Sequence, residues 1–162
     1  METKIKEAGE LEEAFIFDLD GVLADNSPRQ GILRRSGDTK PSSQDWEDFF
    51  KASELDGIYP DTVRLFASLK ERGYKCLIVT GRHEKYHHLT LPWLEKNGII
   101  CDGIYARKGP DFRKDFEFKS EVYTTHIRPY YKVLGVFEDR ADCVKMWRSF
   151  GLTCYQPREA SY

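Results

Sequence analysis

Two aspartates and a glycine follow a short apolar run near the amino end of the chain. The run Ala14-Phe15-Ile16-Phe17 leads into Asp18-Leu19-Asp20-Gly21, and a second acidic group stands much later, at Glu138-Asp139. Carboxylates that gather in one place raise each other's pKa values unless a cation neutralises them, and hard divalent cations prefer oxygen ligands. If the two groups meet in the fold, the sequence predicts a Mg²⁺ site.

The spacing of Asp18 and Asp20 suits phosphoryl transfer. One carboxylate can attack phosphorus and become a covalent intermediate, while a second, two residues along, protonates the leaving oxygen and later activates water. The hydroxyl of Thr80 and an ammonium group, for which Lys119 is the candidate, could bind the phosphoryl oxygens over which negative charge spreads in the transition state. Thr80 could also cap a helix, a role that is compatible with phosphate binding.

Each of the other basic side chains singled out has two possible roles. Arg82 and Arg107 offer planar guanidinium groups that could grip a substrate phosphate or pair with surface acids, and for Arg113 the two roles are equally balanced. The catalytic ammonium could instead come from Lys114 or Lys132, because a helix lysine is most often solvated. The sequence favours substrate contacts for the first two arginines.

The elements that must position these residues alternate along the chain. Short apolar runs predict buried strands at residues 14–17, 75–79, 103–106, 133–137 and 152–155. Helix-like segments separate them at residues 60–72, 83–97, 114–127 and 140–150. Pro92 could kink the second helix or mark its start, and Pro129 ends the third near Arg128.

This alternation predicts an α/β fold with a three-layer open sheet of about five parallel strands. In such sheets ligands bind beyond the carboxyl ends of the strands. Because Asp18, Thr80 and Glu138 each follow a predicted strand, they should meet at one edge of the sheet. The candidate chemistry and the candidate fold therefore agree.

One domain is expected over residues 1–162, since no composition shift marks a linker. The long irregular segment 26–57 could fold over the site as a small cap. Within it, Trp46, Phe49 and Phe50 recur at helical spacing, which is more typical of packing than of stacking on a nucleobase.

The motifs resemble those of a known superfamily. Phe17-Asp18-Leu19-Asp20-Gly21-Val22-Leu23 is similar to the signature of the haloacid dehalogenase (HAD) superfamily of aspartate-nucleophile phosphatases. Val79-Thr80-Gly81-Arg82, Lys119 and Phe137-Glu138-Asp139-Arg140 follow in that family's order, so the resemblance spans most of the chain.

A narrower resemblance is to the 3′-phosphatase domain of phage-type polynucleotide kinase-phosphatases. The residues that carry it are Thr80-Gly81-Arg82 with Tyr86, Thr90 and Trp93; Arg107 with Asp111, Arg113-Lys114-Asp115 and Lys119; Glu138-Asp139-Arg140; and Met146-Trp147-Arg148 with Gly151-Leu152 and Cys154. No Gly-x-x-x-x-Gly-Lys-Ser/Thr loop occurs, so neither a kinase domain nor ATP use is expected.

The resemblance implies a role for each motif. Asp18 would be the nucleophile and a Mg²⁺ ligand, and Asp20 the general acid/base and a ligand through its backbone carbonyl. Thr80 would bind phosphate, Lys119 would stabilise charge, and Asp139 would complete the metal site.

Further residues of the same motifs have supporting roles. Gly81, together with the three arginines, would contact the substrate. Glu138 stands where the family usually has a second aspartate, so we expect it, like Asp142, to lie near the metal without binding it directly.

Composition limits the partners. The net charge is −2 and the pI about 6.1, which excludes a global basic field for nucleic acid. A local patch could supply it, from Arg29, Arg34, Arg35, Arg82, Arg107, Lys108 and Arg113. The four cysteines form no Cys-x-x-Cys pair, and no apolar run approaches the ~20 residues of a membrane span. A cytoplasmic protein without a membrane partner is expected; the oligomeric state stays open.

The predicted function is a Mg²⁺-dependent phosphomonoesterase that works through an aspartyl-phosphate and removes the 3′-phosphate from a DNA or RNA end. Two alternatives stay open. One is a small-molecule phosphatase such as a nucleotidase, with segment 26–57 as a modest cap. The other is a module that binds nucleic-acid ends without turnover.

Overall fold

A parallel sheet forms the centre of the computed structural model, which describes residues 10–35, 37 and 39–160. Its five strands lie in the order β5-β4-β1-β6-β7, and every neighbouring pair is parallel. The strands are β1 (Glu12–Phe17), β4 (Lys75–His83), β5 (Gly103–Arg107), β6 (Tyr131–Phe137) and β7 (Cys154–Tyr155). The prediction of an open sheet of about five parallel strands is confirmed.

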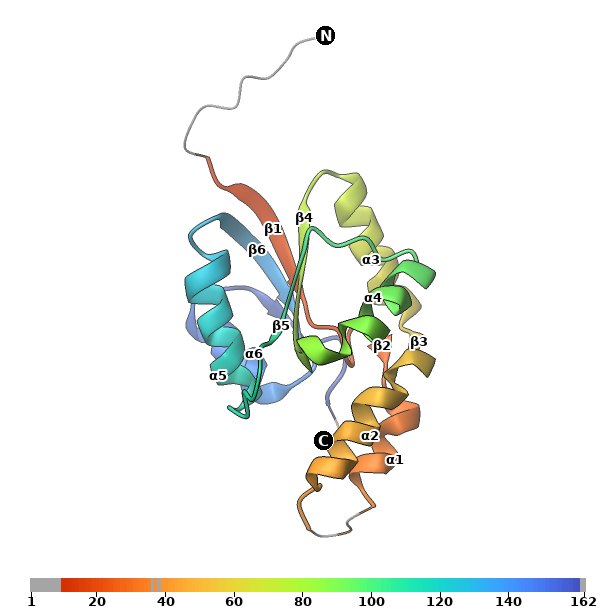
Figure 1. Cartoon of the computed structure of the whole chain (residues 1–162). Coiled ribbons are helices and arrows are strands. Elements are labelled where there is room, and N and C mark those ends of the chain that lie inside the picture. Colours follow the sequence, from red (N-terminus) through yellow and green to blue (C-terminus); the bar gives the residue numbers. More distant parts are fainter. Residues whose placement is uncertain (1–9, 36, 38, 161–162) are drawn as a thin grey trace.

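Helices cover both faces of this sheet, which gives the three layers (Figure 1). One face is covered by α3 (Pro60–Glu71) and α4 (His87–Lys96), the other by α5 (Asp115–Val122) and α6 (Ala141–Ser149). Successive side chains of a strand point to opposite faces, so Ile16 packs with Trp147 of α6, whereas Phe17 packs with Phe66 of α3. This two-sided burial explains why the strands are continuous apolar runs in the sequence.

The aromatic packing of Phe17 fixes the strand that carries Asp18. The Phe17 ring stacks on Phe137 of β6 with centroids 4.5 Å apart and meets Phe66 edge-on at 5.0 Å. The backbone N–H of Asp18 then donates to the carbonyl of Phe137 at 2.9 Å. The ends of β1 and β6, and the acids that follow them, are thereby held together.

Two helix boundaries differ from the prediction. The helix expected from residue 83 begins later, because β4 continues to His83, which pairs with Arg107 of β5, and a short 3₁₀ turn, η3 (Glu84–Tyr86), precedes α4. Pro92 lies inside α4 and does not mark its start. The helix expected over 114–127 is α5 followed by a π-helical turn, η4 (Tyr123–Ile127), which ends ahead of Pro129 because proline has no N–H to continue it.

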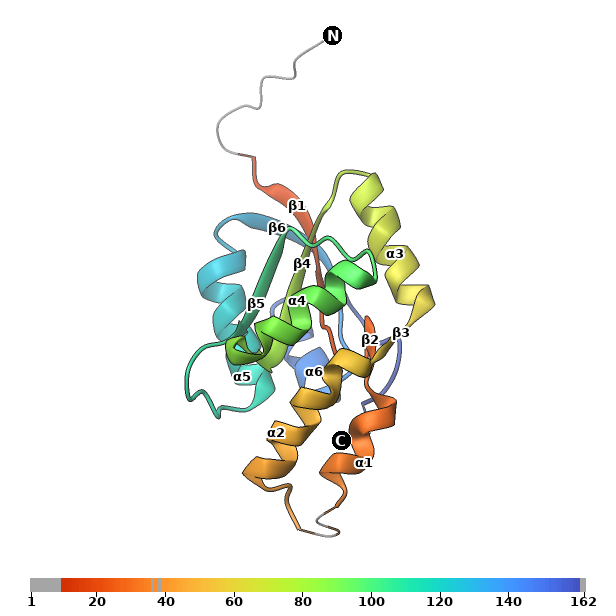
Figure 2. The ribbon, with the colours of Figure 1, turned by 45° about the vertical axis from the view of Figure 1, so that its right-hand side comes forward.

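Most of the segment expected to be irregular is helical. It contains the short elements β2 (Ala24–Asp25), η1 (Ser27–Arg29), α1 (Gln30–Leu33), α2 (Ser43–Lys51), η2 (Ala52–Leu55) and β3 (Gly57–Ile58). β2 and β3 pair antiparallel and close the base of this insertion. α1 and α2 extend beyond the carboxyl ends of the strands (Figure 2). Ser42 is the N-cap of helix α2. Its hydroxyl accepts a hydrogen bond from the backbone N–H of Asp45, and its own backbone N–H donates to the Asp45 carboxylate.

The four cysteines all lie in the described part of the chain and form no disulfide. Three of them, Cys76, Cys143 and Cys154, are buried. Within the described residues, no helix combines the length and the apolar character that crossing a membrane requires.

Phe66→Ala should destabilise the protein much more than Leu65→Ala on the same helix. Phe66 is 2% exposed and packs on Phe17, whereas Leu65 is 39% exposed. Removing a buried phenylalanine costs about 3–5 kcal/mol, and removing a half-exposed leucine costs about 1 kcal/mol or less. Urea unfolding of both variants measures the difference. Equal losses would contradict the packing described for α3.

Candidate active site

A cavity of about 970 Å³ opens at the carboxyl edge of the sheet. Asp18 and Asp20 line it, together with residues of α2, of the segment between β5 and α5, and of the start of α6. Gly81, Arg82, Arg107 and Asp142 also line it, whereas Thr80 does not. The topology thus brings most of the residues singled out in the sequence to one place.

Asp18 is buried at the end of β1 and held from two sides. Its Oδ1 accepts a hydrogen bond from the backbone N–H of Leu19 at 2.8 Å and lies 3.3 Å from Nζ of Lys119. Burial raises the pKa of Asp18 well above its usual value; Lys119 opposes this, and Glu138 adds to it. A cation beside the carboxylate is therefore needed to keep it ionised as a nucleophile.

Lys119 is the charge centre of the site. It is fully buried, and its Nζ lies 2.8 Å from Glu138, 3.0 Å from Asp115 and 3.3 Å from Asp18. Burial by itself lowers the pKa of Lys119, but Asp115, Asp18 and Glu138 outweigh it and raise that pKa well above its usual value. Lys119 of α5 thus lies where an ammonium group could stabilise charge on a phosphoryl group.

Glu138 makes its contacts inside the protein, with Lys119 and its neighbours. Its Oε2 accepts from Lys119 and, at 3.2 Å, from the indole N–H of Trp147, and its Oε1 accepts from the backbone N–H of Arg140 at 3.3 Å. The longer side chain, in place of the aspartate usual in the family, thus reaches back to Lys119. Trp147 is fully buried in the core, and its indole N–H helps to fix the position of Glu138.

A divalent cation fits the acidic group beside Lys119. One carboxylate oxygen from each of Asp18, Glu138 and Asp139 lies within 4.8 Å of the others. Oδ1 of Asp139 is buried without a hydrogen-bond partner, and burial, with Glu138 adding, raises the pKa of Asp139 to about 7. A single ammonium group does not balance these carboxylates, so the donor set suits a hard cation. The side chain of Asp20 lies outside this group.

Gly21 makes room for Asp139. A Cβ on Gly21 would lie 2.0 Å from Oδ2 of Asp139, and the backbone φ of +81° is one that L side chains rarely adopt. The turn after Asp20 therefore requires glycine for two independent reasons.

Asp20 is held by two arginines. Arg29 Nη2 lies 2.5 Å and Arg82 Nη2 2.6 Å from its Oδ1, and Arg82 Nε donates to its Oδ2 at 2.9 Å. Asp56 accepts from both arginines, at 2.8 Å from Arg29 and 3.3 Å from Arg82. Burial raises the pKa of Asp20, but the two guanidinium groups outweigh it and hold that pKa well below its usual value. Asp20 is therefore an ionised carboxylate in this arrangement.

The helical insertion reaches this cluster through Arg29. Its Nη1 donates to the carbonyl of Phe49 at 3.2 Å, and its guanidinium carbon lies 4.0 Å from the centroid of the Phe49 ring. Trp93 of α4 donates its indole N–H to the Asp56 carbonyl at 2.8 Å. These contacts tie α2 and the base of the insertion to the acid that follows β1.

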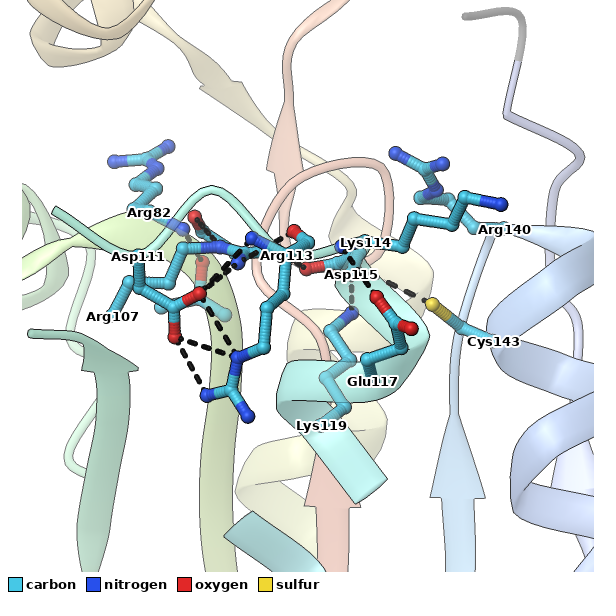
Figure 3. Close-up of polar contacts among 12 residues, drawn as sticks. Arg82, Arg107, Asp111, Arg113, Lys114, Asp115, Glu117, Lys119, Arg140 and Cys143 are labelled. Atoms are coloured by element: carbon cyan, nitrogen blue, oxygen red, sulfur yellow. Dashed lines mark hydrogen bonds and ion pairs between the residues drawn. The ribbon is translucent and has the colours of Figure 1, made fainter. Parts of the chain in front are cut away.

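The three arginines predicted to contact the substrate line the cavity, and each is paired with groups of the chain itself. Arg82 is 1% exposed and is committed to Asp20, since an unpaired carboxylate could not be buried there. Arg107 is buried as well: it donates to the carbonyls of Gly81, at 3.0 Å, and Arg113, at 2.9 Å, and lies 3.1 Å from Asp115 (Figure 3). The exposed Arg113 pairs with Asp111 and Glu121.

Thr80 and Gly81 shape the end of β4. Thr80 is buried and its Oγ1 accepts from the backbone N–H of Arg82 at 3.2 Å, within a continuing strand and not at a helix start. A Cβ on Gly81 would lie 2.5 Å from Oδ1 of Asp115. Gly81 therefore leaves room for the carboxylate of Asp115, at the start of α5, to pack against the end of β4.

The expected basic patch is largely neutralised. Arg29, Arg82 and Arg107 are buried in ion pairs, and Arg35 lies 3.1 Å from Asp48. Because these charges face acids within the molecule, they supply little field to an approaching strand. Asp142, at the cavity rim, lies 3.3 Å from Arg140 and outside the acidic group around Asp139.

Sequence reasoning missed three residues of the site. Asp115 stands four residues before Lys119, a spacing that places the two on one helix face, and this could have identified it. Arg29 and Asp56 lie in the helical insertion, where only the docked fold shows that they meet Asp20. No local pattern marks either one.

Comparison with known proteins agrees with this geometry. A family model described as "Polynucleotide kinase PNKP phosphatase domain" matches residues 12–162, nearly the whole chain. The chain belongs to this family. The HAD resemblance seen in the motifs is thus confirmed, and the family is one of HAD-type phosphatases, that is, hydrolases.

Individual relatives are longer than the chain. A structure named "Structure of the Pnkp1/Rnl/Hen1 RNA repair complex" has a TM-score of 0.76 and 28% identity, covering 100% of this chain and 48% of that one. A protein of Autographa californica nuclear polyhedrosis virus, provisionally named as a bifunctional polynucleotide kinase/RNA ligase, is 26% identical over 78% of this chain and 19% of its own length. The chain therefore spans half or less of these relatives.

A more distant structure shares the fold alone. The class C acid phosphatase from Bacillus anthracis with tungstate bound has a TM-score of 0.60 and 18% identity, over 82% of this chain and 54% of that one. The likeness is one of overall architecture.

In this PNKP phosphatase-domain chain, Lys119→Met should destabilise the fold and do so in a pH-dependent way. The variant leaves buried acids without their cation, which costs about 3–5 kcal/mol near neutral pH. Asp115, whose pKa Lys119 holds down against burial, stabilises the wild type above its unfolded pKa, and this contribution is lost as pH falls through its lowered folded value. The gap between wild type and variant should therefore shrink in acid.

Urea unfolding at pH 8 and at about pH 2.5, within the acidic window set by the lowered pKa of Asp115, tests this, with Lys114→Met, an exposed lysine just before α5, as the control. A Lys119→Met variant as stable as Lys114→Met at pH 8 would contradict the buried ion pairs.

Arg82→Met and Arg113→Met should have very different effects on stability, although both arginines are candidates for substrate contact in the sequence. Loss of Arg82 leaves Asp20 and Asp56 with Arg29 alone and should cost about 3–5 kcal/mol, whereas loss of the exposed Arg113 should cost about 1 kcal/mol or less. Thermal unfolding at neutral pH measures both. Similar values for the two variants would mean that the Asp20 cluster does not exist as described.

Proposed function

We propose that this chain is a Mg²⁺-dependent phosphomonoesterase that works through an aspartyl-phosphate and acts on the 3′-phosphate of a DNA or RNA end. The observation that carries the proposal is the position of Asp18: it lines the cavity, with Lys119 3.3 Å away and the acidic group of Glu138 and Asp139 beside it. Nucleophile, charge stabiliser and candidate cation ligands thus surround one point.

The first step belongs to Asp18. An oxygen of its carboxylate attacks phosphorus, the bond from phosphorus to the 3′ oxygen breaks, and the leaving oxygen takes up a proton. Lys119 holds Oδ1 of Asp18 and lies close enough to bind an equatorial phosphoryl oxygen as charge develops there. Because Leu19 also binds Oδ1, the carboxylate cannot rotate freely and presents its other oxygen.

The second step suits Asp20 as it stands in the structure. An ionised carboxylate can accept a proton from the water that attacks the aspartyl-phosphate, which releases inorganic phosphate and restores Asp18. Protonating the leaving group in the first step requires Asp20 to hold a proton, and Arg29 and Arg82 oppose this. We propose that this proton is delivered when Asp20 moves away from the two guanidinium groups.

The cation's place would be among Asp18, Asp139 and the backbone that follows β1, with Glu138 adjacent. Bound there, Mg²⁺ would neutralise phosphate charge and keep Asp18 ionised. The partnerless oxygen of Asp139 is the donor that such a cation would satisfy.

Nucleic acid is the favoured substrate because of the relatives. Their names refer to RNA repair and to polynucleotide kinase and RNA ligase activities. Nucleic-acid ends that carry a phosphate are the substrate this suggests for the phosphatase chain. The cavity, at about 970 Å³, is larger than a phosphate requires and leaves room for a nucleoside.

Phosphate release from 3′-phosphorylated oligonucleotides, 5′-phosphorylated oligonucleotides and 3′-mononucleotides tests the function. The 3′-ended oligonucleotide should be hydrolysed fastest, EDTA should abolish release, and Mg²⁺ should restore it. Asp18→Asn should lose roughly 10⁴-fold or more in kcat, while Asp48→Asn, a partly buried acid on α2 outside the cavity, should match the wild type. Label from radioactive substrate should appear on acid-quenched wild type and Asp48→Asn but not on Asp18→Asn.

Two other outcomes of this experiment would favour the alternative functions. Equal rates on the oligonucleotide and the mononucleotide would favour a nucleotidase. A wild type inert with Mg²⁺ toward every phosphomonoester would contradict the enzyme and favour an end-binding module.

A further inference from the structure

One wall of the cavity is a row of aromatic rings that the proposed chemistry does not use. Trp46 and Phe50 of α2 stack with centroids 6.0 Å apart, and Phe50 continues onto Tyr86 at 5.1 Å, with interplanar angles of 27° and 32°. All three rings line the same cavity as Asp18. The sequence grouped Trp46 with Phe49, but Phe49 is buried beneath the row against Arg29, whereas Trp46 is 37% exposed.

A further aromatic ring lines the cavity from another segment of the chain. Phe112, between β5 and α5, is 87% exposed and is accompanied by Pro110. Its ring lies 6.3 Å from that of His83, the last residue of β4. Exposing a phenylalanine this far keeps its apolar surface in water, a cost that a flat apolar ligand would remove.

We propose that Trp46 and Phe112 form a stacking site for the terminal nucleobase of a 3′-phosphorylated strand whose phosphate lies at Asp18. The proposal rests on the proposed function. Base, sugar and phosphate of one nucleotide form a flat group joined to an anion, and the cavity offers the matching pair: aromatic faces at α2 and at Phe112, and the catalytic acids at the ends of the strands.

The polar groups that adjoin the aromatic row on α2 and η3 are engaged with one another. Glu47 accepts from the Tyr86 hydroxyl and from Lys85, both at 2.5 Å. Recognition at the rings would therefore come mainly from π surface, which every base has. We therefore expect tolerance of all bases, with purines bound more tightly than pyrimidines because they stack over a larger area.

The aromatic wall is attached to the buried part of the insertion. Phe49 anchors α2 on Arg29, whose guanidinium group is held by Asp20 and Asp56. The cavity rim contains Lys114, whose Nζ lies 5.8 Å from the Phe116 ring centroid. An ammonium group at this rim is suitably placed for the phosphodiester of the preceding nucleotide.

Matched oligonucleotides that end in a normal 3′-phosphorylated nucleotide or in an abasic 3′-phosphorylated sugar test the site. In the wild type the base should lower KM by roughly 5- to 100-fold. Trp46→Ala and Phe112→Ala should each remove most of that advantage, raise KM for the normal end with little change in kcat, and leave the abasic end and p-nitrophenyl phosphate unchanged. Trp46→Phe should restore most of the effect.

Tyr130→Ala is the control, an exposed aromatic outside the cavity, just before β6 at the opposite edge of the sheet. It should behave as wild type. Phe112 is so exposed that its variant should fold normally, which keeps the test decisive if Trp46→Ala is unstable. Equal KM for normal and abasic ends in the wild type would overturn the stacking site while leaving the phosphatase intact.

A binding measurement separates this failure from failure of the proposed function. Trp93 and Trp147 are 3% and 0% exposed, so quenching of tryptophan fluorescence by an added strand reports mainly on Trp46. In the Asp18→Asn background, the normal 3′-phosphorylated strand should quench and the abasic strand should not. Inert wild type with no hydrolysis of any phosphomonoester would reject the phosphatase; absent or equal quenching by both strands would reject the stacking site.

Discussion

The ammonium group of Lys119 is the interaction on which the site depends. It is fully buried and contacts carboxylates from three different elements: Asp18 after β1, Asp115 at the start of α5 and Glu138 after β6. Without this cation the acids would repel one another and could not stay buried and ionised. The same contact that allows the strands' ends to come together also orients the proposed nucleophile, so stability and chemistry share one residue.

A second buried cluster neutralises the charge of Asp20, and it links the sheet to the helical insertion. Arg82 reaches Asp20 from β4, and Arg29 reaches it from η1, with Asp56 completing the charge balance. Two arginines and two aspartates leave no net charge, which is why so polar a group can lie under the insertion. The insertion is therefore anchored electrostatically at the acid that follows β1.

The local motifs and the parallel α/β arrangement of about five strands could be predicted from the sequence because they follow from short apolar runs that alternate with helical segments. Buried strands are continuous apolar runs, and right-handed parallel crossovers bring Asp18, Lys119 and Asp139 to one edge whatever the loops do. The ion pairs of Arg82 and Arg107 could not be predicted, because they depend on which acids the folded insertion and the β5–α5 segment bring near these arginines. The extension of β4 to His83 likewise depends on a partner, Arg107, supplied by another strand.

Gly21 and Asp139 are far apart in the chain, but they are in direct contact in the fold. The space that a side chain on Gly21 would need is the space that the Asp139 carboxylate fills. Any side chain at Gly21 would therefore displace the acid that is a candidate cation ligand. Shortening that acid would free the space but would still leave a left-handed turn that disfavours any replacement for the glycine.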